Sequence, residues 1–289
     1  MITKWCGSRS ELECCVSRLN AKREMSERYL SGVEELAGYC ASCGDIVKFG
    51  NTVTPGEKWK NLRESFICPR CGLNGRMRHA YIELAAVIES LSEPKVLLFE
   101  RVTPFFSALE KIYPFVEGCE YVGPDITPGT IIEQKMIDRK LRVRHEDMMA
   151  ISFPDESLDV IFHADVLEHV PDWIQGIREC HRVIKPGGTL VFTCPFFFME
   201  ESITRAKVEN GEIVHISEPA YHGNPMSQSG SLVYTQHGWP LLEELEKLGF
   251  ETVESGLLWD PWQGILSTNN PCVEGQMWPL MFRCRKPAG

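Results

Sequence analysis

The feature that most constrains the fold is the regular alternation of short apolar segments with amphipathic segments from residue 80 onward. Five apolar segments predict buried strands, at residues 95–100, 119–125, 141–145, 158–163 and 188–194. Helices are predicted around them, at residues 80–91, 103–113, 131–139, 173–183 and 239–248. Strands that alternate with helices form a doubly wound, mostly parallel sheet. We therefore expect an α/β domain over residues 80–289, with terminal strands at 250–257 and 280–284.

Local signals mark some boundaries of these elements. Thr103 followed by Pro104 predicts a capping residue and the first position of a helix. The run Lys185-Pro186-Gly187-Gly188 predicts the end of the helix before it. Residues 196–238 show little periodicity, and loops of that length inside a compact domain are usually functional or disordered. We expect a lid or insert there.

The first 79 residues have a different character. Residues 1–39 are predicted to be helical, because apolar residues recur at helical spacing between Glu24 and Leu36. Residues 40–79 are rich in glycine, turn residues and cysteine. A core of that size is too small to fold alone, which is the situation in which a bound metal is needed.

Two C-x-x-C pairs lie in this second segment, and each is followed by a glycine: Cys40, Cys43 and Gly44, then Cys68, Cys71 and Gly72. Two intervening residues let both thiolates reach one ion from a tight turn, and the glycine permits the bend. Four thiolates suit tetrahedral Zn²⁺ and leave no open position, so we expect a structural zinc-ribbon module. Unpaired core cysteines and a redox pair are the alternatives. The other eight of the twelve cysteines are scattered, as expected of free thiols in a reducing compartment.

Charge and hydropathy limit the partners. The formal charge of −10 argues against a long phosphate-binding surface. A basic cluster around the second cysteine pair keeps nucleic-acid contact open as a minor alternative; it comprises Lys58, Lys60, Arg63, Arg70, Arg76 and Arg78. The sequence shows no transmembrane segment and no signal-peptide pattern at residues 1–9, so we expect a cytosolic protein with no membrane partner. The oligomeric state is not predicted.

Three successive motifs carry a family resemblance. They read DMMAISFPDESLDVI at residues 147–161, HADVLEHVPD at 163–172 and HRVIKPGGTL at 181–190. Together they resemble the class I S-adenosylmethionine-dependent methyltransferases, in the type 11-like branch, over about residues 95–195. The resemblance implies a Rossmann-like sheet that binds S-adenosylmethionine at the carboxyl ends of its strands.

The resemblance also implies cofactor contacts. Glu100 holds the acid position of the first motif, Asp125 would hold the ribose hydroxyls and Asp147 the adenine amine. Met148 would pack on the adenine, and Ala164 with Asp165 would lie beside the methyl group. Each of these acids has a helix N-cap as its alternative role. The glycines of the family's first motif are missing here, where the chain reads Glu100-Arg101-Val102-Thr103-Pro104-Phe105-Phe106. Without them the backbone cannot approach the cofactor as closely, so the cofactor site is narrower. The positive end of the helix that begins after Thr103 can still face the cofactor's carboxylate.

Candidate bases for the acceptor proton lie in two places. His169 follows the fourth strand, and Tyr221 and His222 lie among turn formers in the expected lid. His163, at the end of a buried strand, is expected to be structural. We therefore predict methyl transfer to an oxygen or nitrogen of a small molecule, such as a natural product or a sugar-like compound. The alternatives are an RNA-modifying methyltransferase with a zinc module and a non-catalytic protein that kept the fold.

Overall fold

The computed structural model describes residues 2–51, 60–135, 140–270 and 273–289. The chain divides into two compact units. The first unit comprises Met1–Ser90 and Glu254–Phe282, and the second comprises Leu91–Val253 and Arg283–Gly289. These boundaries differ from the expected ones at residues 39 and 79. Residues 80–90 and the C-terminal segment 254–282 both group with the N-terminal residues in the first unit.

A mostly parallel sheet forms the second unit. Its strands run in the order β9-β8-β4-β5-β7-β6. The parallel members are β4 (Val96–Leu98), β5 (Glu117–Glu120), β7 (Lys140–His145), β8 (Leu158–Ala164) and β9 (Ile184–Thr193). In the centre, β4 pairs with β8 from Val96↔Val160 to Leu98↔Phe162. The doubly wound α/β class is confirmed.

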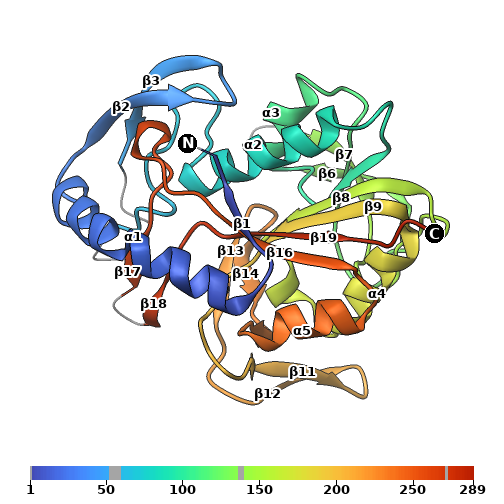
Figure 1. Ribbon diagram of the computed structural model, residues 1–289. Coiled ribbons are helices and arrows are strands. Elements are labelled where there is room, and N and C mark those ends of the chain that lie inside the picture. Colours follow the sequence, from blue (N-terminus) through green and yellow to red (C-terminus); the bar gives the residue numbers. More distant parts are fainter. Residues whose placement is uncertain (1, 52–59, 136–139, 271–272) are drawn as a thin grey trace. The chain divides into compact units, whose positions relative to one another are not determined.

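Helices cover both faces of this sheet. In Figure 1, α3 (Pro104–Glu110) lies above the strands, while α4 (Trp173–Val183) and α5 (Pro240–Lys247) lie below them. The predicted start of α3 is confirmed, because the Thr103 hydroxyl accepts a hydrogen bond from Phe106 N at 3.2 Å and Pro104 follows it. The ring of Phe105 stacks on that of Phe162 with centroids 4.8 Å apart, which anchors the helix on β8.

Two predictions at the other edge of the sheet are wrong. Residues 131–139 were expected to be helical, but Ile131–Lys135 form β6, antiparallel to β7. The β-branched pair Ile131 and Ile132 favours a strand once a partner is available, which local periodicity cannot show. Residues 136–139 lie outside the described part of the chain. Strand β5 ends at Glu120, so Asp125 does not end that strand as expected.

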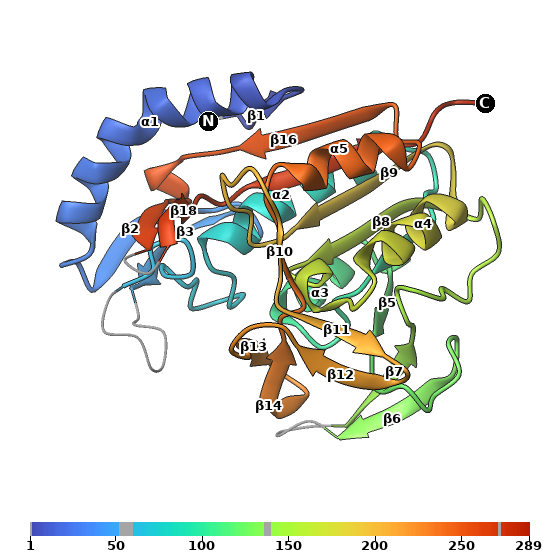
Figure 2. The ribbon, with the colours of Figure 1, turned by 90° about the horizontal axis from the view of Figure 1, so that it is seen from below.

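The expected lid contains regular structure. Residues 196–238 include three antiparallel pairs: β10 (Ile203–Thr204) with β15 (Thr235–Gln236), β11 (Ala206–Glu209) with β12 (Glu212–His215), and β13 (Tyr221–Asn224) with β14 (Ser227–Leu232). Asn210 and Gly211 join β11 to β12 with φ values of 52° and 82°. Such a two-residue Asn-Gly turn is a local hairpin signal that hydrophobic periodicity does not reveal. Figure 2 shows the β13–β14 hairpin beyond the arrowhead of β8.

The first unit is built from a long helix, a hairpin and a second helix. Its elements are β1 (Lys4–Cys6), α1 (Arg9–Leu30), β2 (Glu35–Cys40), β3 (Asp45–Gly50), α2 (Gly75–Glu89), η2 (Pro261–Gln263), β17 (Thr268–Asn270) and β18 (Val273–Met277). The strands β16 (Thr252–Leu257) and β19 (Met281–Arg285) each span the division between the units. Helix was correctly predicted for residues 9–30, but residues 4–6 form the strand β1 and residues 35–39 belong to β2, which pairs with β3.

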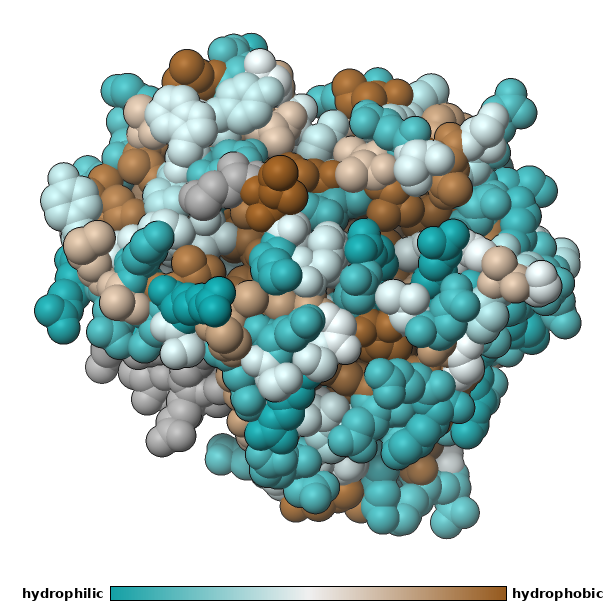
Figure 3. Space-filling model, in the orientation of Figure 1, coloured by the Kyte–Doolittle hydropathy of each residue, from teal (hydrophilic) through white to brown (hydrophobic). Residues whose placement is uncertain are grey.

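The described surface is mixed in character. On the face shown in Figure 3, hydrophobic residues are interspersed with hydrophilic ones. Among the exposed apolar side chains are Ile112, Phe115 and Ile213. No described helix combines the length and the apolar composition that crossing a membrane requires.

Candidate functional site

The four cysteines of the C-x-x-C pairs converge in the first unit. Their sulfurs lie within 4.8 Å of one another. Cys40 Sγ is 3.7 Å from Cys71 Sγ, and Cys43 Sγ is 3.7 Å from Cys68 Sγ. Zn–S bonds of about 2.3 Å in a tetrahedron imply sulfur separations of about 3.8 Å. The set therefore has the spacing of a four-thiolate metal site.

The backbone of both turns matches the expectation from the sequence. Gly44 N and Gly72 N each donate a 2.9 Å hydrogen bond to the carbonyl of the first cysteine of their pair. The φ values of Gly44 and Gly72 are 64° and 76°, a region that favours glycine. Burial raises the pKa of Cys43 to about 11, so holding four thiolates here requires nearby positive charge.

Arg78 supplies one such charge from α2. Its side chain is 0% exposed and its guanidinium donates to the carbonyls of Phe66, Leu73, Gln263 and Gly264. Burial lowers its pKa to about 10, against an opposing effect of the four cysteines, so it remains a cation at neutral pH. The guanidinium carbon lies 3.9 Å from the centroid of the Phe49 ring.

The basic cluster seen in the sequence is largely internal. Arg63 and Arg76 are buried and both pair with Glu64, and Arg70 pairs with Asp45. With Arg78 bound to carbonyls, most of the cluster does not present free positive charge. Lys58 lies outside the described residues. The structure gives no support to a phosphate-binding role for these arginines.

In the second unit, acids follow four neighbouring parallel strands. Glu100 comes after β4, Glu120 ends β5, Asp147 comes after β7, and Asp165 follows β8. These strands are adjacent in the order β8-β4-β5-β7, so the four acids occupy one edge of the sheet. Ligands of doubly wound sheets bind at this edge. The structure brings Glu100, Asp147 and Asp165 together as expected and adds Glu120.

Each of these carboxylates already makes a local contact. Glu100 Oε1 accepts from Ala164 N at 3.2 Å, which links the ends of β4 and β8. Asp147 Oδ1 accepts from Met149 N at 2.8 Å, and Asp165 Oδ1 accepts from Thr193 Oγ1 at 2.8 Å. Asp165 has a φ of 51°, an unusual conformation for a residue other than glycine. Met148 is buried, and a Cβ on Gly176 would lie 3.0 Å from its Cγ.

Asp125 lies five residues beyond the end of β5 and is exposed. Burial raises the pKa of Tyr121, which directly follows β5, and the charges of Asp147 and Asp125 raise it further. Tyr121, Glu120 and Tyr234 were not predicted as site residues. Tyr121 directly follows β5, which was the only local signal for it, whereas Tyr234 comes from the far end of the insert.

The glycine-free turn between β4 and α3 is stabilised by a carboxylate of β5. Val102 N donates to Glu120 Oε1 at 2.9 Å, and Arg101 N donates to Cys119 O at 3.3 Å. The neighbouring strand β5 leaves room for the side chain of Phe106 because it carries a glycine there. A Cβ on Gly118 would lie 2.5 Å from the Phe106 ring. Burial raises the pKa of Glu120 to about 7. The turn is therefore packed against β5, with its carboxylate partner at the edge where the acids gather.

The candidate bases lie beside the end of β8. His169 ends η1 (Leu167–His169) and His222 belongs to β13, and their ring centroids are 5.0 Å apart. Tyr221, the preceding residue, is exposed. Glu168, which was not predicted, lies between the two histidines: its Oε1 is 3.6 Å from His169 Nε2 and 3.3 Å from His222 Nδ1. The sequence signal for Glu168 was only its position next to His169.

His163 has the structural character expected of it. It is fully buried, its ring stacks on Phe192 with centroids 4.8 Å apart, and neither ring nitrogen has a hydrogen-bond partner among the described residues. Burial lowers its pKa to about 3, against a raising effect of Asp165, and His237 lowers it further.

We expect His163 to make the second unit labile to acid. Between pH 6.5 and about 3 the unfolded chain binds a proton at this position and the folded chain does not, so stability falls as the pH falls. The contribution to the slope is at most about 1.4 kcal/mol per pH unit. Urea unfolding of the wild type and of His163→Phe across this range measures the difference in slope. Parallel curves for the two proteins would contradict a neutral buried imidazole.

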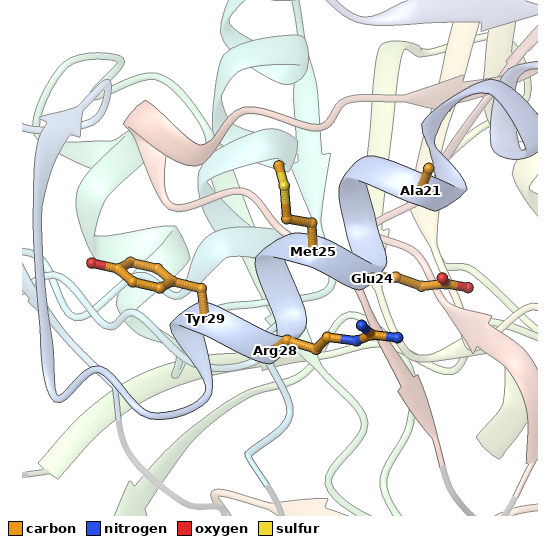
Figure 4. Close-up of a pocket in the computed structure, with 5 residues that line it drawn as sticks. All are labelled: Ala21, Glu24, Met25, Arg28 and Tyr29. Carbon is orange, nitrogen blue, oxygen red and sulfur yellow. The ribbon is translucent and has the colours of Figure 1, made fainter.

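The pocket drawn in Figure 4 lies elsewhere. Its described lining comes from α1 and consists of Ala21, Glu24, Met25, Arg28 and Tyr29. Met25 and Tyr29 are exposed apolar side chains of that helix. None of the candidate residues contributes to it, and the lining offers no cluster of metal ligands.

Comparison with known proteins agrees with the geometry at the sheet edge. Residues 106–192 match the model of the family described as methyltransferase domain. A probable S-adenosylmethionine-dependent methyltransferase of Mycolicibacterium smegmatis is 31% identical over 74 residues, which cover 26% of this chain and 29% of the relative. A 2-methyl-6-phytyl-1,4-hydroquinone methyltransferase of Synechocystis is 48% identical over 84 residues, which cover 29% and 26%. The chain thus spans less than a third of the length of each of these two relatives.

A solved S-adenosylmethionine-dependent methyltransferase from Mesorhizobium loti is also similar, with 17% identity and a TM-score of 0.42, covering 71% of this chain and 97% of that one. The matched residues run from α3 to the end of β9, which includes β5, β7 and β8 and the acids that follow them. The second unit therefore contains a segment that matches the methyltransferase domain family, and S-adenosylmethionine-dependent methyltransferases are among the similar proteins.

Proposed function

We propose that this protein transfers a methyl group from S-adenosylmethionine to an oxygen or nitrogen of a small molecule. The observation that carries the proposal is the row of acids at the carboxyl ends of β8, β4, β5 and β7, beside a pair of histidines. Relatives named for small-molecule acceptors, such as the demethylmenaquinone methyltransferase of Alkalihalophilus pseudofirmus, 37% identical over 79 residues, support a small-molecule acceptor.

The residues at this edge fit a molecule with the polar groups of S-adenosylmethionine. Its hydroxyl and amine groups are hydrogen-bond donors, and Glu100, Glu120, Asp125 and Asp147 are acceptors that follow neighbouring strands. We assign the ribose to Glu120 and Asp125 jointly, because Glu120 ends β5 while Asp125 remains near Tyr121. We assign the adenine to Asp147 and Met148, and the region of the methyl group to Ala164 and Asp165.

The chain's own contribution to methyl transfer is alignment. Bound S-adenosylmethionine would supply a methyl group already activated on a sulfonium. The protein then has to hold the acceptor atom in line and keep water away. We assign this role to the hairpins of residues 203–236. Two contacts support the assignment: Tyr234 N donates to Glu168 O, and His169 Nδ1 lies 2.8 Å from Leu232 O. These contacts fasten the insert to the segment that follows β8.

We propose that the cysteine cluster holds a structural Zn²⁺. The sulfur spacing, the two glycine turns and a buried cation nearby support this assignment. All four ligands come from the chain, so the ion would have no open position for chemistry. Its role would be to brace the first unit, whose core cluster includes Cys40 and Cys68 with Phe49 and Phe66.

Calorimetric titration with S-adenosylmethionine tests the cofactor assignment. We expect micromolar binding to the wild type and at least a tenfold weaker Kd in Asp147→Asn, a loss of about 1.4 kcal/mol. The amide can still accept the hydrogen bond from Met149 N, so the turn is kept while the charge is removed. Asp155→Asn is the matched control, because Asp155 is an exposed acid paired with Arg182 and its loss should leave the Kd unchanged.

Two results would count against the assignment. If neither S-adenosylmethionine nor its demethylated product binds the wild type, the second unit is a binding fold without cofactor function. If Asp147→Asn binds as tightly as the wild type, the adenine is held by other residues. A product screen over phenols, hydroxy acids and amines then tests the acceptor separately from the cofactor.

A further inference from the structure

Glu168, His169 and His222 form a second group of metal-ligand side chains. One ligand atom from each lies within 4.8 Å of the others. The group joins two distant segments, since Glu168 and His169 come from η1 after β8 and His222 comes from β13 in the insert. It is distinct from the cysteine cluster, which belongs to the first unit.

Glu168 is the unusual member of this group. Its side chain is 1% exposed, and among the described residues neither carboxylate oxygen receives a hydrogen bond. Its ion-pair contacts within the described chain are with the two histidines, each of which is charged only when protonated. A buried carboxylate without donors is costly unless a cation compensates it. The local geometry therefore points to a cation between the three side chains.

His169 is oriented as a metal ligand would be. Its Nδ1 lies 2.8 Å from Leu232 O, and a carbonyl can only accept, so Nδ1 carries the proton. In the neutral ring the lone pair is then on Nε2, the atom that faces Glu168 Oε1. A backbone carbonyl that fixes the tautomer through the distal nitrogen is the usual support for a metal-binding histidine.

We propose that Glu168 Oε1, His169 Nε2 and His222 Nδ1 bind one divalent transition-metal ion. Bond lengths of about 2.1 Å imply ligand separations of about 3.0–3.4 Å, depending on coordination geometry. The observed separations from Glu168 Oε1 are 3.3 and 3.6 Å, close to this range, and the two histidine nitrogens lie within 4.8 Å of each other. Two imidazoles with one carboxylate suit Mn²⁺, Fe²⁺ or Zn²⁺ and leave coordination positions open.

The open coordination positions of such an ion indicate which class of acceptor it would bind. An ion here would bind the oxygen of a hydroxyl-bearing acceptor and lower its pKa, as metal ions do for bound water and alcohols. His169 and His222 would then act as ligands and not as bases. This acceptor step rests on the proposed function, whereas metal binding itself does not.

Titration of the zinc-loaded full-length protein with MnCl₂ tests the site. The loss of the free Mn²⁺ resonance signal reports binding, and Mn²⁺ does not compete for four thiolates because it prefers oxygen and nitrogen ligands. We expect one Mn²⁺ per chain, with affinity reduced at least tenfold in Glu168→Gln and in His222→Ala. Glu168→Gln keeps the side-chain shape, and His222 is exposed, so both variants should fold. His215→Ala is the matched control, because His215 is an exposed histidine of the same insert on β12.

The outcomes separate this inference from the proposed function. Mn²⁺ binding by the wild type that is lost in Glu168→Gln but kept in His215→Ala supports the site, whether or not methylated product is found. Absence of Mn²⁺ binding by the wild type, or equal binding by all four proteins, overturns it and leaves the cofactor assignment standing. S-adenosylmethionine titration of the same variants should give unchanged Kd values; a matching loss of cofactor binding would overturn the assignment of these residues to a separate site.

Discussion

Cys68→Ser is expected to abolish stoichiometric zinc and to unfold the cysteine cluster of the first unit. Cys68 is buried, its sulfur lies 3.7 Å from that of Cys43, and its backbone N donates to Leu73 O at the turn before α2. A structural zinc ion contributes on the order of 10 kcal/mol to the folding of small metal modules. Elemental analysis for zinc and the thermal unfolding midpoint measure the two effects together.

Cys14→Ser provides the control for that experiment. Cys14 is an exposed thiol on α1 and is not part of the cluster, so its loss should change neither the zinc content nor the midpoint. A strong chelator should reproduce the effect of Cys68→Ser on the wild type. Protein that is purified without zinc, and whose midpoint is unaffected by the chelator, would contradict a structural metal.

The central sheet could be predicted because its signals are local. Strand β8 has the apolar run Val160-Ile161-Phe162 at its centre, and α4 has a clear polar and apolar face, so each element can be predicted from its own residues. The start of α3 was predictable for the same reason, because Thr103 and Pro104 are adjacent. Strand β6 was missed because Ile131 and Ile132 become a strand through pairing with β7, which comes later in the chain.

The candidate sites likewise divide into those with local sequence signals and those formed by residues distant in the sequence. The cysteine cluster was predictable because spacing within each pair fixes the turn, and Gly44 and Gly72 mark it. The acids after the strands followed from the family motifs, but the position of Asp125 did not, because β5 ends earlier than its apolar residues suggest. The Glu168, His169 and His222 group could not be predicted, since more than fifty positions separate the two histidines and only the fold of the insert brings them together.

Arg78→Met is expected to destabilise the first unit strongly. The guanidinium is the donor for four backbone carbonyls from three separate segments, the turn at Phe66, the turn at Leu73 and the loop at Gln263 and Gly264. Each buried acceptor left without a donor costs about 1–3 kcal/mol, with incomplete additivity. Loss of the cation also removes positive charge next to the four cysteines, which raise its pKa.

A loss of about 3 kcal/mol or more in the free energy of unfolding is therefore expected for Arg78→Met. Methionine fills a similar apolar volume against Phe49, so the effect reports the lost donors and charge more than an empty space. Urea unfolding of the zinc-loaded protein measures it, and Arg70→Met is the matched control because Arg70 is an exposed arginine of the same unit paired with Asp45. Equal midpoints for the two variants would show that the carbonyls find water or other donors, and that Arg78 does not hold the three segments together.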